Sequence, residues 1–164
     1  MSKQSTYISK NFTFEELFRS ETAVALGINN TPNATVAKRL EDLVVNVLQP
    51  LRDLWGAPII ISSGYRCNAL NAAVGGSPSS QHMLGEAVDI RTKSDSRDDN
   101  MALLKCFLRS GIEFDELISE DVNSKYQPNW IHVSYTTRRA NRKKKLTMKR
   151  DSRGRAVYYK GINI

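Results

Sequence analysis

Histidine and cysteine are scarce in this chain, which has only two of each among its 164 residues. Two cysteines, Cys67 and Cys106, are too few for a disulfide framework, so we expect both to be thiols that are at least partly buried. No apolar run is long enough to cross a bilayer. Residues 1–14 lack the apolar segment of a signal peptide. We therefore expect synthesis in the cytoplasm and no membrane span.

The rest of the composition is that of a globular protein, with 40% hydrophobic and 25% charged residues. Apolar spacing and capping residues predict helices early in the chain, and β-branched runs predict strands later. We expect an α+β fold, built as one domain around a mainly antiparallel sheet. The helices are expected within 12–27, 29–58, 63–76 and 95–111, and the strands within 59–62, 87–92, 113–120, 129–135 and a hairpin at 145–159.

Positive charge is concentrated at the C-terminal end. Residues 138–160 contain eleven Lys or Arg and one acid, whereas residues 1–137 contain thirteen Lys or Arg and sixteen Asp or Glu. Such a block is typical of a solvated face or an interaction arm. Nucleic acid, an anionic cell-wall polymer and an anionic membrane surface are all candidate partners on charge alone. Nucleic acid is disfavoured because the run "RRANRKKK" has no interleaved aromatics for base stacking.

Both histidines stand in segments that suggest a metal site. His82 lies in the loop "SSQHMLG", Asp89 follows it in a predicted strand, and His132 lies in the strand "NWIHVSY". Two imidazoles and one carboxylate suit zinc, and three protein ligands leave a fourth position open, as in catalytic zinc sites. An iron site would use the same residue types. A lone histidine on a strand is also commonly an ordinary structural residue.

The sequence segments around these residues favour the catalytic zinc interpretation. The segments "SGYRC", "LNAAVGG", "SQHMLGEAVDI" and "WIHVSY" resemble the zinc D-Ala-D-Ala carboxypeptidase family of peptidoglycan peptidases. The family pattern S-x-H-x-x-G-x-A-x-D is matched at every fixed position, and a histidine follows on a strand. The matching residues are Ser80, His82, Gly85, Ala87 and Asp89. The N-terminal segments "FTFEEL", "NTP" and "LQPLRD" resemble the phage and prophage endolysin branch.

This resemblance carries several expectations. It implies the α+β fold shared with the Hedgehog signalling domain, and one Zn²⁺ per chain held by His82, Asp89 and His132. It implies hydrolysis of a peptide bond near D-alanine in the peptidoglycan stem peptide, for cell-wall lysis or remodelling. Arg66 matches the family arginine that faces the substrate, where it would stabilise an oxyanion or hold a carboxylate. Ser80 would either bind substrate or order its loop, and Gly85 would serve the turn.

One departure from the family concerns the general base. Several relatives carry a carboxylate three residues before the second histidine, and here that residue is Asn129, whose amide cannot accept the proton. Glu120 is the favoured replacement if strands 113–120 and 129–135 pair with Ile118 opposite His132, because it then lies on the same face as His132. A slip of one residue would send Glu120 to the other face. Asp115 and Glu116 are less favoured.

Two functional hypotheses follow from these patterns. The first is a single peptidase domain over residues 1–164, with a basic extension at 138–164, acting on the cell wall after release from the cell. The alternative, which Asn129 allows, is a non-catalytic zinc module that binds wall peptides or a protein partner.

Overall fold

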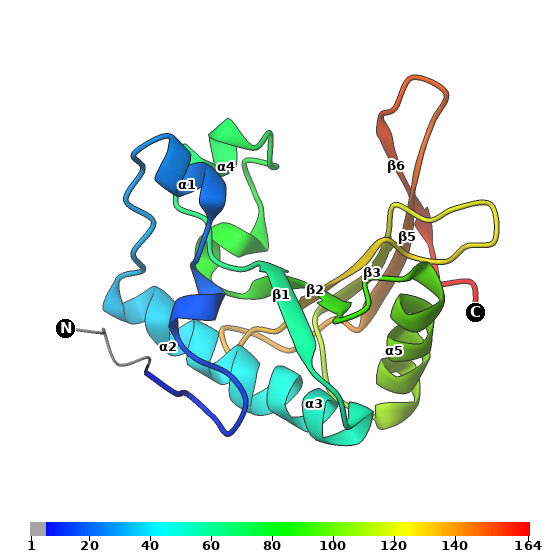
Figure 1. Ribbon diagram of the computed structural model, residues 1–164, viewed down its shortest axis with the longest axis horizontal. Coiled ribbons are helices and arrows are strands. Elements are labelled where there is room, and N and C mark those ends of the chain that lie inside the picture. The colour runs from blue at the N-terminus through cyan, green and yellow to red at the C-terminus, as the bar shows by residue number, and fades with distance from the viewer. Residues whose placement is uncertain (1–5) are drawn as a thin grey trace.

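One six-stranded sheet organises the protein in a computed structural model that describes residues 6–164 (Figure 1). The strand order is β1-β2-β4-β3-β5-β6, and every neighbouring pair is antiparallel except β3 and β5. The strands are β1 Ile59–Ser63, β2 Ala87–Thr92, β3 Glu116–Glu120, β4 Trp130–Ser134, β5 Lys144–Arg150 and β6 Ala156–Lys160. The expected α+β fold with a mainly antiparallel sheet is confirmed.

Five α-helices and three shorter helical turns surround the sheet in the described part of the chain. The α-helices are α1 Glu21–Ala25, α2 Ala34–Leu43, α3 Gln49–Trp55, α4 Asn68–Ala73 and α5 Arg97–Ser110. The short turns are η1 Glu15–Leu17, η2 Val44–Leu48 and η3 Gln81–Leu84. Within residues 6–164, none of these helices has both the length and the apolar character needed to span a bilayer. The first five residues, on which the expectation about a signal peptide partly rests, lie outside the described part.

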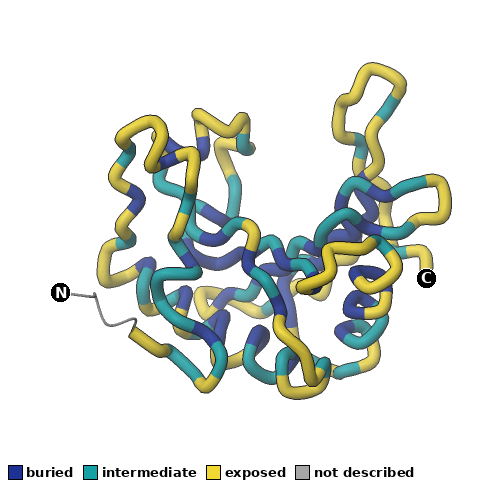
Figure 2. Tube along the Cα trace, in the orientation of Figure 1, coloured by how far each residue is buried: buried dark blue, intermediate teal, exposed yellow. Residues whose placement is uncertain are grey.

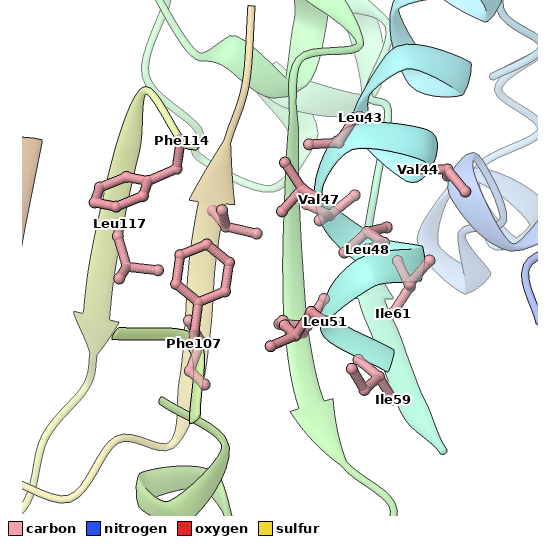
Figure 3. Packing of buried hydrophobic residues seen from close by; sticks show 14 of the residues in the cluster. Leu43, Val44, Val47, Leu48, Leu51, Ile59, Ile61, Phe107, Phe114 and Leu117 are labelled. Atoms are coloured by element: carbon pink, nitrogen blue, oxygen red, sulfur yellow. The ribbon is translucent and has the colours of Figure 1, made fainter. Parts of the chain in front are cut away.

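The main core lies between one face of the sheet and helices α2, α3 and α5 (Figure 3). Strand β2 shows why the sheet has two different faces, because successive side chains of a strand point in opposite directions. Val88 and Ile90 are fully buried in the core, whereas Asp89 and Arg91 point to the other face. That second face carries the candidate site. Figure 2 shows that buried residues gather in the interior of the molecule, whereas exposed residues are most frequent in the outer loops.

The helix expected within residues 12–27 is two separate pieces, which corrects that prediction. Thr13 and Glu16 make the expected capping contact, with the Thr13 backbone N–H donating to the Glu16 carboxylate at 2.7 Å. The turn that they start, η1, ends at Leu17. Ser20 then adopts an extended backbone and its hydroxyl accepts from the Ala23 N–H, which caps α1 as a new helix.

The long helix expected within residues 29–58 is continuous but irregular. Between α2 and α3 the chain forms one π-helical stretch, η2, immediately before Pro50. Proline has no N–H to donate, so a shift in the hydrogen-bond pattern at this point accommodates it. The helix ends at Gly56, whose φ of 74° is the left-handed conformation that glycine adopts readily.

The C-terminal segment, residues 138–164, contributes two strands to the sheet. Strands β5 and β6 form the expected hairpin, and β5 also pairs with β3. Six of the eleven cations in residues 138–160 make ion pairs in the described part of the chain, and five of these pairs reach acids in residues 1–137. The paired cations are Arg138, Arg139, Arg142, Lys144, Arg150 and Arg155. Part of the basic extension is therefore paired with acids of the preceding residues, and part of its charge is left for other partners.

Two valines of η2, one buried and one exposed, provide a matched test of how the core contributes to stability. Val47 is fully buried, whereas Val45, two residues earlier, is 51% exposed. Val47→Ala should lower the free energy of unfolding by about 2 kcal/mol, because two buried methyl groups are lost and a cavity remains. Val45→Ala should change it by no more than about 0.5 kcal/mol. Urea unfolding of both variants gives the comparison, and equal effects would contradict this packing.

Candidate metal centre and active site

His82 is held in one orientation by the segment around it. It lies in η3, which begins after Ser80, and the Ser80 hydroxyl accepts from the His82 backbone N–H at 3.3 Å. The His82 ring is buried, and its Nδ1 lies 2.8 Å from the carbonyl oxygen of Gly64. Because a carbonyl can only accept, Nδ1 carries the proton, and the lone pair of His82 is on Nε2.

Asp89 and His132 meet through the pairing of β2 with β4. They occupy directly opposite positions in this antiparallel ladder and therefore share a face of the sheet. Asp89 Oδ1 lies 3.0 Å from His132 Nδ1 and 3.3 Å from His82 Nε2. The two imidazole rings are 5.1 Å apart between centroids. The three residues expected from the sequence are thus brought together.

This set of donor atoms fits zinc. One atom from each of His82, Asp89 and His132 lies within 4.8 Å of the others. In a tetrahedral zinc site with bonds of about 2.0–2.1 Å, two ligand atoms are about 3.3 Å apart, close to the two separations to Asp89. The proton on His82 Nδ1 leaves the facing Nε2 free to ligate, with the Gly64 carbonyl as the outer partner typical of metal-binding histidines.

Charge within the cluster also favours a cation. Burial alone would raise the pKa of Asp89, but the two imidazoles lower it well below its usual range. Burial alone would lower the pKa of His132, but its hydrogen bond to Asp89 and the charge of that carboxylate raise it. The carboxylate is therefore ionised and draws positive charge to this point, whether as protons or as a metal ion.

Two glycines allow the chain to approach itself closely at the site. Gly85 has a φ of 71°, and a Cβ there would lie 2.7 Å from a methyl group of Val36, so its expected role in the turn is supported. A Cβ on Gly64 would lie 2.0 Å from the carbonyl oxygen of Leu17. Gly64 also supplies the carbonyl that orients His82, and we had not predicted this function from the sequence.

Glu120 lies on the same face of the sheet as His132. Strand β3 pairs with β4 so that Ile118 is opposite His132 and Glu120 is opposite Trp130. The sequence allowed this register and a second one shifted by one residue, which would have placed Glu120 on the opposite face. The Glu120 side chain is only 6% exposed, and its Oε2 has no hydrogen-bond partner among the described residues. Burial, with some help from the charges of Asp89 and Glu116, raises the pKa of Glu120 to about 7.

The less favoured carboxylates have other partners. Asp115 is fully buried and accepts hydrogen bonds from Arg139, Arg142 and Gln81. Burial alone would raise the pKa of Asp115, but the two guanidinium groups lower it well below its usual range. Glu116 is paired with Lys144 at 2.8 Å.

Asn129 points away from the ligands. Its side-chain amide donates to the Asp121 carboxylate at 3.1 Å, and its backbone carbonyl accepts from the Asn100 side-chain amide at 2.8 Å. The residue that stands where several relatives carry a carboxylate therefore makes structural contacts, which leaves Glu120 as the unpaired carboxylate beside His132.

Arg66 is a cation without an acidic partner in the described part of the chain. Its Nη2 lies 3.4 Å from the Ser80 hydroxyl, and its buried Nε has no hydrogen-bond partner. Burial lowers the pKa of Arg66, while the charge of Asp89 raises it. The Ser80 hydroxyl thus contacts both the backbone of its own loop and Arg66, and both of the roles expected for Ser80 remain open.

Two fully buried carboxylates connect the ligand loop to the C-terminal segment, and neither connection was predicted from the sequence. Glu86 lies between the ligands His82 and Asp89 in the chain and accepts from Arg138 Nε and Nη2 at 2.6 and 2.9 Å. Asp115 accepts from the amide of Gln81, the neighbour of His82, at 3.0 Å. These pairs join residues that are 24 or more positions apart, so local patterns do not reveal them.

Comparison with known proteins agrees with this geometry. The family model for peptidase M15 matches residues 10–134, which include all three ligand residues. The chain belongs to the peptidase M15 family. No curated protein matches it in sequence. Peptidases of this family are zinc-dependent, so the family supports a metallopeptidase and agrees with the donor set of His82, Asp89 and His132. The match ends before β5, so the β5–β6 hairpin lies outside it.

The donor set predicts one zinc per chain. His82→Ala, Asp89→Ala and His132→Ala should each lower the zinc content of purified protein well below that of wild type, because each removes one of three ligands. Metal analysis by plasma mass spectrometry measures this. Arg66→Ala is the control, since it lies beside the cluster without supplying a ligand atom, and it should keep its zinc. Full zinc content in all three ligand variants would refute the assignment.

Proposed function

We propose that this M15 peptidase hydrolyses a peptide bond in peptidoglycan stem peptides, as a D-Ala-D-Ala carboxypeptidase or an endopeptidase. The role would be cell-wall lysis or remodelling of the endolysin type, after the protein reaches the wall. The observation that carries the proposal is the carboxylate of Glu120. It is buried on the face that presents His132, and its Oε2 has no hydrogen-bond partner within residues 6–164. A purely structural carboxylate would be expected to have its buried oxygen satisfied.

In this proposal Glu120 is the general base. Bound by His82, Asp89 and His132, zinc supplies Lewis-acid polarisation of the scissile carbonyl and increases the acidity of water. The Glu120 carboxylate accepts a proton from the water whose oxygen attacks the carbonyl carbon. It then returns that proton to the amide nitrogen as the carbon–nitrogen bond breaks, so that a carboxylic acid and an amine leave.

Arg66 is proposed to meet the substrate. Its guanidinium is half-buried and lacks an acidic partner in the described part of the chain. It lies close enough to Asp89 for the charge of that carboxylate to raise the pKa of Arg66. A cation held in this way would stabilise the negative charge that develops on the carbonyl oxygen, or would hold a terminal carboxylate of the substrate. Ser80, which contacts Arg66, is proposed to assist by binding substrate or by fixing the guanidinium.

The second candidate function is a zinc module that binds wall peptides or a protein partner without cutting. Asn129 favours it, because the base found at that position in several relatives is absent. The buried, unpaired Glu120 favours catalysis instead. Activity measurements on Glu120 variants separate the two.

We also propose that the unpaired cations of the C-terminal segment bind an anionic cell-wall polymer. In the described part of the chain, five cations of residues 138–160 make no ion pair, namely Lys143, Lys145, Lys149, Arg153 and Lys160. They stand beyond the family match, so they would contribute affinity rather than chemistry.

The base assignment predicts a selective loss of turnover. Glu120→Gln should keep its zinc, because Glu120 is not in the ligand cluster, and should lower kcat by roughly 100-fold or more. Glu116→Gln, the same change on the same face of the same strand, should keep most activity. Wild-type activity should fall as the pH drops below the pKa of Glu120, since only the ionised carboxylate accepts a proton. If turnover fell in Glu116→Gln and not in Glu120→Gln, the general base would be Glu116 and the assignment of Glu120 would be wrong.

The tail assignment predicts a salt-dependent effect on binding alone. Lys143→Gln with Lys145→Gln should weaken binding to purified cell walls at low salt, and the difference should shrink near 0.15 M salt, where charges are screened beyond about 8 Å. Hydrolysis of a short soluble stem peptide should not change. Co-sedimentation with walls measures the binding. An equal loss on the soluble peptide would place these lysines at the active site.

A further inference from the structure

A groove of about 440 Å³ lies beside the metal centre, between α1, β1 and α4. Its floor is β1 and the turn that follows. Its apolar wall is Leu70 of α4 and Val74, which follows that helix, and the segment from Arg19 to Thr22 lines the other side. In Figure 1, α1 and α4 stand together on one side of the sheet, next to β1. None of the three metal ligands lines this groove.

Two residues that line the groove nevertheless adjoin the metal ligands. Gly64 lines it, and the carbonyl of Gly64 is the group that accepts from His82. Ser63 also lines it and is paired with Asp89 across the β1–β2 ladder. A chain held in the groove would therefore lie next to the residues that orient His82 and pair with Asp89.

The groove is electropositive. Three arginines line it against one acid, Glu21. Arg19 is exposed and has no ion pair in the described part of the chain. Arg91 stands two residues after Asp89 on the same face of β2. Its guanidinium donates to the Thr92 carbonyl at 3.3 Å and reaches the Asp95 carboxylate only at 3.7 Å. Besides Arg66, the groove thus offers two cations with incomplete pairing, which suits a carboxylate.

The floor of the groove suits an extended peptide. Strand β1 is at the edge of the sheet and pairs only with β2 in the described part of the chain. An edge strand has a row of backbone N–H and C=O groups on its outer side, and extended peptides bind such edges by adding a strand.

We infer that this groove binds an extended acidic segment of the substrate peptide along β1, with a substrate carboxylate held by Arg19 and Arg91. The inference rests on the proposed function and adds a substrate preference to it. The chemistry that the groove recognises is a free carboxylate on a peptide, and its amide would bind more weakly because it offers no charge to the guanidinium groups.

Two stem pentapeptides test this preference by calorimetric titration. One has a γ-linked D-glutamate with a free α-carboxylate at its second position, and the other has that carboxylate as an amide. The parent protein is zinc-loaded Glu120→Gln, in which the peptide should persist during titration. It should bind the acidic peptide about five- to tenfold more tightly than the amide. Arg19→Gln with Arg91→Gln should remove this preference.

The control is Arg52→Gln with Arg109→Gln, which removes two positive charges outside the groove and should keep the preference. Equal affinity for the two peptides in the parent, no binding of either peptide, or an unchanged preference in the groove variant would each overturn the inference. The titration measures binding and not cleavage. If wild type cleaved neither peptide, the proposed function would be contradicted, but the measured preference for the acidic peptide would still support the groove as its binding site.

Discussion

The antiparallel pairing of β2 with β4 is the constraint on which the metal centre depends. It places Asp89 directly opposite His132, and a slip of one residue would send one of them to the other face of the sheet. The register is fixed by burial, since Val88, Ile90, Ile131 and Val133 form the core side of the same two strands. The helices that pack on the core side of these strands therefore fix the positions of Asp89 and His132 on the opposite side.

The polar groups of the open face are arranged around this pair. His82 is oriented by the Gly64 carbonyl, whereas Glu120 and Arg66 each have a buried polar atom without a partner among the described residues. Leaving such atoms unpaired costs about 1–3 kcal/mol each. Elsewhere buried charges are paired, as Glu86 is with Arg138 and Asp115 with Arg139. The two charged groups that have a buried atom without a partner among the described residues thus lie beside the metal ligands, where a substrate would satisfy them.

Much of this arrangement could be predicted from the sequence. The short motif around His82 and Asp89, with His132 on a later strand, indicated the ligands through family resemblance. Apolar spacing indicated the helices, and β-branched runs indicated the strands. The face of Glu120 could not be predicted, because two registers one residue apart were both compatible with the strand pattern. The structure selects the register in which Ile118 is opposite His132.

The errors have a physical cause as well. The ion pairs of the cations at 138–160 were not predicted because their acidic partners, such as Glu86 and Asp115, are distant in sequence. The split between η1 and α1 was missed because Ser20, which caps the second helix, also fits a continuous amphipathic pattern. The groove beside β1 depends on which strand is at the edge, and a single sequence does not reveal strand order.

The most direct test is mass spectrometry of purified peptidoglycan incubated with the zinc-loaded protein. The account predicts new fragments from one cleaved peptide bond near D-alanine, formed by wild type, absent when a chelator removes the metal and greatly reduced with Glu120→Gln. Intact stem peptides after prolonged incubation with zinc-loaded wild type would contradict hydrolysis, and if the protein still bound them, the binding-module alternative would replace it.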